Sequence, residues 1–116
     1  MDFLRENGID VDSAIEILGD MEMVDETLGD FLLEMDERLP LIEEYKNNNN
    51  MEDYAILVHA IKGDSKYLGF TKLSELAYNH QVYAEKGDVS YINSHYDELM
   101  KEINNIVGIV KKYKEM

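Results

Sequence analysis

Three histidines are the best candidates for group-transfer chemistry in this sequence, which contains no cysteine that could act as a nucleophile. They are His59, His80 and His95. A neutral imidazole, with a pKa near about 6.5, keeps a lone pair on one ring nitrogen at neutral pH and is then a competent nucleophile. Because most histidines on helices pack, cap or simply face water, the surroundings of each one must decide whether it does chemistry.

The position of His59 on its predicted helix turns its side chain away from the core. At about 100° per residue, the apolar Ile61 lies about 200° around the helix from His59, within the stripe that faces the core. On the exposed side, Lys62 and Lys66 lie about 60° and about 20° from His59. Gly63 lies about 40° from it on the other flank. The spacing predicts an exposed imidazole beside two ammonium groups and a position without a side chain.

Phosphoryl transfer is the chemistry that these neighbours favour. A phosphoryl group on His59 would lie within one or two helical turns of both lysines, and Gly63 leaves room for an incoming donor. Because water screens charges at an exposed site, we expect the lysines to orient the transfer rather than to drive it. We expect no cofactor and no metal site on this chain. The metal, the acceptor carboxylate and most of the transition-state stabilisation would then come from a partner.

The net charge narrows the choice of partner. The 116 residues include 25 acidic and 11 basic side chains, which gives a formal charge of -14. Such a charge repels phosphate backbones and anionic lipid surfaces, so we expect no nucleic acid and no membrane as partners. Of these side chains, 15 acidic and 3 basic ones fall in residues 1–50. With no cysteine and no apolar N-terminal run, we expect a cytoplasmic monomer.

Helical periodicity covers almost the whole chain, and no stretch alternates with the two-residue period of a strand. Pro40 removes one backbone hydrogen bond from the long second helix, so we expect a kink or a local break there. The four asparagines at 47–50 predict a turn, and Asn50 is suited to cap the next helix. The expected helices are a short one at 11–18, a long one whose apolar stripe runs from Val24 to Ile42, then 51–68, 71–86, and a last one capped by Asp88.

Short connections make neighbouring helices antiparallel. The predicted fold is therefore an all-α antiparallel up-and-down four-helix bundle with a short extra N-terminal helix. We expect a single domain over residues 1–116, complete in itself because the chain begins with Met and has the length of one domain.

The eleven residues from His59 to Gly69, HAIKGDSKYLG, resemble the signature of histidine phosphotransfer (HPt) domains. The Gly8–Val11 opening, the acidic second helix and the Lys86–Asp88 turn also lie where that family has them. The resemblance implies that His59 is phosphorylated, Lys62 is the family's cation and Gly63 is the clearance position. It also implies that Gln81 is a hydrogen-bond donor that steadies the ring or its phosphate.

A protein of this family relays a phosphoryl group between aspartates of receiver domains and has no kinase activity of its own. The resemblance thus implies response-regulator receiver domains or a hybrid histidine kinase as partners, with Mg²⁺ held only by the receiver. We expect the docking surface to include Ala55, Ile56 and the short helix that carries Ile15.

Three residues depart from the family pattern or lie outside it. Asp64 stands where small uncharged residues are usual, and we expect it to weaken phosphate binding or to pair with Lys66. His80 lies on the inner stripe of its helix, which predicts a partly buried, hydrogen-bonded core histidine. His95 is expected to be a surface residue.

Two other functions compete with this hypothesis. A di-iron bundle would need Glu-x-x-His pairs, but the residues three positions before the histidines are Ile56, Ala77 and Ile92. The other alternative is a non-phosphorylated helical-bundle module that binds a receiver domain or other signalling partner. The presence of His59, Lys62 and Gly63 together favours the hypothesis of a phosphorelay protein. A module that only binds has no need of the nucleophile.

Overall fold

Helices alone make up the regular structure of the chain, which a computed structural model describes over residues 2–116, with side chains from residue 3 onward. The absence of strands in that range confirms the all-α prediction. The elements are α1 (Asp2–Glu6), α2 (Val11–Leu18), α3 (Met21–Asn47), α4 (Met51–Tyr67), α5 (Thr71–Glu85) and α6 (Val89–Glu115).

Polar side chains fix the starts of three long helices. Asp20, Asn50 and Asp88 precede α3, α4 and α6, and each accepts a hydrogen bond from the backbone N–H three residues later. These bonds satisfy amide groups that the helix itself leaves unpaired. The predicted caps at Asn50 and Asp88 are therefore confirmed, and α4 and α5 begin at the predicted residues.

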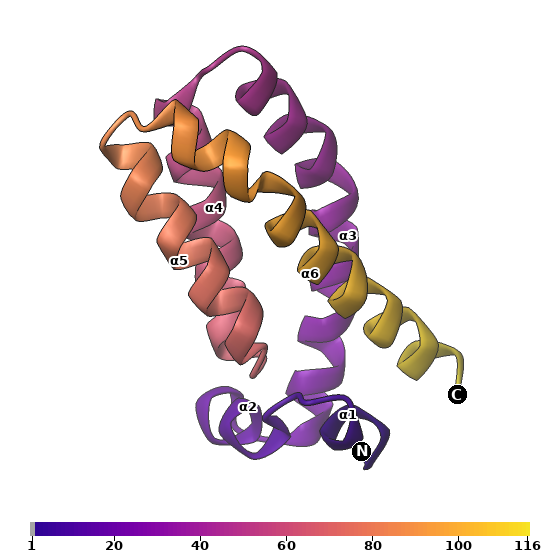
Figure 1. Cartoon of the computed structure of the whole chain (residues 1–116). Coiled ribbons are helices and arrows are strands. Elements are labelled where there is room, and N and C mark those ends of the chain that lie inside the picture. The colour runs from indigo at the N-terminus through magenta and orange to yellow at the C-terminus, as the bar shows by residue number, and fades with distance from the viewer. Residues whose placement is uncertain (1) are drawn as a thin grey trace.

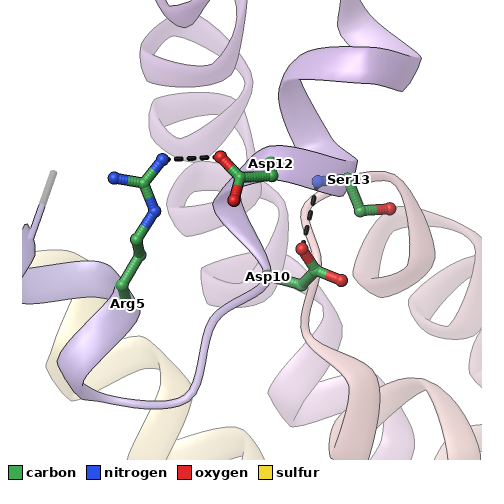
Figure 2. A network of polar contacts seen from close by, with 4 residues as sticks. All are labelled: Arg5, Asp10, Asp12 and Ser13. Atoms are coloured by element: carbon green, nitrogen blue, oxygen red, sulfur yellow. Dashed lines mark hydrogen bonds and ion pairs between the residues drawn. The ribbon is translucent and has the colours of Figure 1, made fainter.

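The first helix was not predicted, so the described chain has six helices where the sequence indicated five. It has five residues, too few for helical periodicity to be recognised. Arg5 of α1 lies 2.6 Å from Asp12 of α2 (Figure 2). The two side chains are 41% and 80% exposed, so the pair contributes little stability. The fully buried Leu4 is the stronger anchor for α1.

The turn between α4 and α5 is fixed against the start of α2. Gly69 has a φ of 77°, and its carbonyl accepts a hydrogen bond of 3.0 Å from the N–H of Asp10. A Cβ at position 69 would overlap the backbone of Asp10, so only glycine fits. The Asp10 side chain in turn accepts from the N–H of Ser13 and caps α2 (Figure 2).

The helix α3 continues through Pro40 for its full 27 residues, so the local break that we allowed for does not occur. Pro40 and Asp36 are both exposed, and the Asp36 carbonyl that loses its bond can be hydrated. On either side of the proline, Met35 and Ile42 are buried in the core and hold the two halves in place.

The four long helices pack in a ring in which α3 contacts α4 and α6, and α5 contacts the same two. Consecutive long helices run in opposite directions, and α1 and α2 lie across the end where α3 begins (Figure 1). Phe31 and Phe70 meet edge to face in the core with ring centroids 5.1 Å apart. Over the range that the structure describes, no helix is long and apolar enough to span a membrane.

Candidate functional site

His59 lies on the exposed face of α4, as its helical angle predicts. Its Nδ1 atom is 3.0 Å from Oε1 of Gln81, which comes from the adjacent helix α5. The structure thus brings together two of the predicted site residues, 22 positions apart in the chain. The close packing of α4 along α5 provides this contact.

The contact with the ring runs opposite to one of the two donations expected of Gln81. We expected Gln81 to donate to the ring or to its phosphate, but toward the ring it presents its amide oxygen, which can only accept, so Nδ1 of His59 donates and carries the proton. The other ring nitrogen, Nε2, then keeps the lone pair. The amide nitrogen of Gln81 donates to Oε2 of Glu85 at 3.4 Å.

The two lysines lie further along α4 than His59, toward the turn into α5, and line a second pocket between α4 and α5. Nζ of Lys62 lies 5.4 Å from the centre of the Tyr78 ring. Lys62 and the exposed Lys66 line this pocket with Ser65 and Tyr78, and His59 is not among the residues lining it. Gln81 thus contacts the imidazole directly, whereas Lys62 and Lys66 follow His59 on the next two turns of α4.

Gly63 is free of local structural demands. It lies inside α4, and a Cβ built at this position would have no heavy atom within 4 Å. Neither packing nor backbone conformation requires glycine here. Any requirement for glycine would have to come from a molecule that approaches α4 from outside.

Asp64 does not pair with Lys66, which corrects one of the two expectations for it. Its Oδ2 lies 2.6 Å from Nη1 of Arg38 on α3. The other guanidinium nitrogen, Nη2, lies 3.2 Å from Glu34. A hydrogen bond with Asp64, together with burial, raises the pKa of Glu34. Arg38 thus shares its charge between two carboxylates at the α3–α4 contact.

His80 is a core residue, as predicted, and is more completely buried than expected. Only 1% of it is exposed, and its Nδ1 is 2.8 Å from the hydroxyl oxygen of Tyr54. Burial lowers the pKa of His80 to about 4, so the ring is neutral at neutral pH. His95 is half-buried and stacks on Tyr91 at 4.1 Å, which corrects the expectation of a plain surface residue.

An open groove beside His59 has an apolar floor. Met51, Ala55, Ile56 and Ala84 line it, together with the charged Glu52 and Glu85 at its edges. Ile56 is 65% exposed. The groove includes two of the residues expected in the docking surface, whereas Ile15 on α2 is not among those that line it.

Glu85 and Arg38 are the site neighbours that the sequence did not indicate. Glu85 follows Gln81 by four residues on one helix, so the spacing alone could have pointed to it. Arg38 and Asp64 are 26 residues apart, and no local pattern links them. Among the residues that the structure describes, no group of three or more histidine, aspartate or glutamate side chains is placed to hold a metal ion.

Comparison of the sequence with models of known protein families gives a match to one family. The model of the Hpt domain matches residues 26–107, which include all of α4 and α5. A curated relative, the phosphorelay intermediate protein rdeA of Dictyostelium discoideum, is 24% identical over 97 residues. The match covers 84% of this chain and 38% of the relative, so the chain spans well under half of that protein. No solved structure gives a significant match.

Proposed function

The chain belongs to the Hpt domain family, and on that basis we propose that it is a histidine phosphotransfer protein of a phosphorelay in which His59 carries the phosphoryl group. The observation that carries the site assignment is the 3.0 Å contact between His59 Nδ1 and Gln81 Oε1. It holds an exposed imidazole in one orientation and leaves the lone pair on Nε2. The name of the Dictyostelium relative, a phosphorelay intermediate protein, supports the same function.

In the proposed reaction, Nε2 of His59 attacks the phosphorus of an aspartyl phosphate on a receiver domain. The N–P bond forms as the P–O bond to the aspartate breaks, and the electron pair leaves with the carboxylate. The imidazole retains the proton on Nδ1, so the phosphorylated ring becomes positively charged. Reversal of these steps toward a second aspartate completes the relay.

The direction of the Gln81 bond suits this reaction. An acceptor oxygen against Nδ1–H stabilises the positive charge that develops on the ring, whereas a donor at that place would oppose it. We assign to Gln81 the role of orienting His59 and stabilising its charged form. The receiver domain supplies Mg²⁺ and the aspartate, and this chain uses no cofactor of its own.

Lys62 and Lys66 are proposed to attract the phosphoryl group from the side of α4. Lys62 lies one turn from His59 and has a long flexible side chain that can leave the Tyr78 ring. At about 5 Å a pair of unit charges is worth about 0.8 kcal/mol in water, so the effect is orientation more than driving force. Lys66 lies a further turn away and contributes less. Gly63 provides the space through which the donor approaches.

We further propose that α3 to α6 form the predicted four-helix bundle, with α1 and α2 as a cover over one end. The chain would act as one monomeric domain over residues 1–116. Its partners would be receiver domains, of response regulators or of a hybrid histidine kinase. The groove beside His59, with Ala55 and Ile56, is the surface on which such a domain would dock.

The test is incubation of the protein with a phosphorylated receiver domain, followed by measurement of acid-labile, alkali-stable label. Wild type and His95→Gln should accept the label, and His59→Gln should not. Label on His59→Gln equal to that on wild type would overturn the site assignment. Stable binding of the receiver without any label on wild type would instead support the alternative of a module that only binds. Label obtained from ATP alone, without a partner, would contradict the absence of kinase activity.

A further inference from the structure

We propose that Glu85 is a positioning residue that orients the amide of Gln81 and thereby decides which nitrogen of His59 is the nucleophile. The inference rests on the proposed function for its biological meaning, but the proton position that it concerns belongs to the unphosphorylated protein. The observation is a continuous chain of two hydrogen bonds. His59 Nδ1 is 3.0 Å from Gln81 Oε1, and Gln81 Nε2 is 3.4 Å from Glu85 Oε2.

A glutamine amide by itself leaves the choice of nitrogen open. Rotation of the amide by half a turn would present the NH₂ group to His59 in place of the oxygen. Nδ1 would then have to accept, and the ring proton would move to Nε2. The remaining lone pair would face Gln81, and the exposed nitrogen would have no lone pair with which to attack phosphorus.

Glu85 removes this ambiguity because an ionised carboxylate can only accept hydrogen bonds. Only the NH₂ side of Gln81 can bond to it, so the oxygen side must face His59. Gln81 and Glu85 are four residues apart on α5, which places them on the same face one turn apart. Glu85 is exposed while Gln81 is half-buried, so the carboxylate stays in contact with water as it holds the amide.

A second effect follows from the same chain of bonds. A carboxylate behind the amide polarises it, which makes Oε1 a stronger acceptor for the Nδ1–H of a positively charged ring. The negative charge of Glu85 therefore acts on the imidazole through Gln81 and remains separated from the phosphoryl group by the length of that side chain.

The groove offers a matched control for the charge. Glu52 also lines the groove with His59, on the first turn of α4, but the hydrogen bonds of Gln81 are to His59 and Glu85. Substitution of Glu52 by alanine removes one negative charge from the groove, as substitution of Glu85 does, but leaves the hydrogen bonds of the Gln81 amide intact. An effect specific to Glu85 must therefore come from its bond to Gln81.

The test uses ¹⁵N-labelled histidine and the ring nitrogen chemical shifts of the full chain, without phosphate or partner. At about pH 8, well above the usual histidine pKa of about 6.5, the shifts of His59 report which nitrogen carries the proton. Wild type should carry it on Nδ1. Glu85→Ala should lower the ratio of the Nδ1–H to the Nε2–H form by about threefold, as expected for one exposed hydrogen bond. Glu85→Gln, whose amide can donate as well as accept, should also lower the ratio, and Glu52→Ala should leave it unchanged.

Unchanged shifts in Glu85→Ala would overturn the inference, and so would an equal change in Glu52→Ala. Far-ultraviolet circular dichroism of each variant checks that α5 remains folded. Phosphotransfer from a receiver domain should slow by a similar factor of about three in Glu85→Ala. If wild type shows the Nδ1–H form but accepts no label, the proposed function fails while the role of Glu85 in placing the proton stands.

Discussion

Nη1 of Arg38 lies 2.6 Å from Oδ2 of Asp64, so the one carboxylate in the segment from His59 to Gly69 is bound to α3. The two side chains are 18% and 31% exposed, so this ion pair at the α3–α4 contact is largely shielded from water. The guanidinium of Arg38 also offsets the negative charge of the carboxylate next to Gly63. The sequence alone suggested Lys66 as its partner, on the same helix.

Loss of Arg38 should destabilise the fold, because Asp64 and Glu34 would then repel each other without a cation between them. We expect Arg38→Ala to lower the free energy of unfolding by about 1–2 kcal/mol, as for other partly buried charged hydrogen bonds. Urea unfolding measures the loss. In a double-mutant cycle with Asp64→Asn, a coupling energy near zero would contradict the importance of this pair.

Gly63→Ala should separate stability from activity. The added Cβ meets no atom within 4 Å, so the protein should gain about 0.5–1 kcal/mol from better helix propensity. Phosphotransfer from a receiver domain should nevertheless slow, since the methyl group occupies the space left for the donor. Urea unfolding and the rate of label transfer measure the two effects.

Gly108→Ala provides the matched control for that variant. Gly108 lies inside α6 and also has no heavy atom within 4 Å of a built Cβ. It should gain similar stability with no change in transfer. A wild-type transfer rate in Gly63→Ala would remove the clearance role from Gly63.

Lys62→Ala should slow phosphotransfer by about fourfold, the factor that corresponds to the screened attraction of one charge at about 5 Å. Lys66→Ala should have a smaller effect, because that side chain is a further turn from His59. Both effects should diminish as salt is added, since the charges are at the surface. Transfer rates at low and high ionic strength test this, and equal rates for Lys62→Ala and wild type at low salt would contradict it.

Acid should destabilise the protein through His80. Its pKa is about 4 when buried in the folded chain and near about 6.5 when the chain unfolds. The unfolded state therefore binds a proton first, and stability that is complete above about pH 6.5 is lost as the pH falls toward about 4, by up to about 3 kcal/mol.

The contribution of His80 can be isolated with His80→Phe. This variant lacks the titrating group, so its stability should fall less steeply between about pH 6.5 and about pH 4. Urea unfolding at several pH values compares the two slopes. Equal slopes would mean that carboxylates, and not His80, control the acid response.

The exposure of His59 could be predicted from the sequence because the helical period fixes its angle relative to Ile61. Helix starts were predictable because Asn50 and Asp88 cap through local hydrogen bonds. The direction of the hydrogen bond between Gln81 and His59 was not predictable, since it depends on where α5 lies against α4. The Arg38–Asp64 pair likewise depends on how two helices pack, a relationship that no local spacing encodes.

The position of α3 in the ring has an electrical consequence. This helix carries nine acidic and two basic side chains, whereas α4 carries three acidic and two basic ones, and α5 two acidic and one basic. Because α3 and α5 both contact α4 and α6, the most acidic helix lies across the ring from one wall of the His59 groove. The molecule thus has a permanent electric dipole, and a negatively charged surface that came near would turn the α4–α5 side of the molecule toward itself before the two surfaces touched.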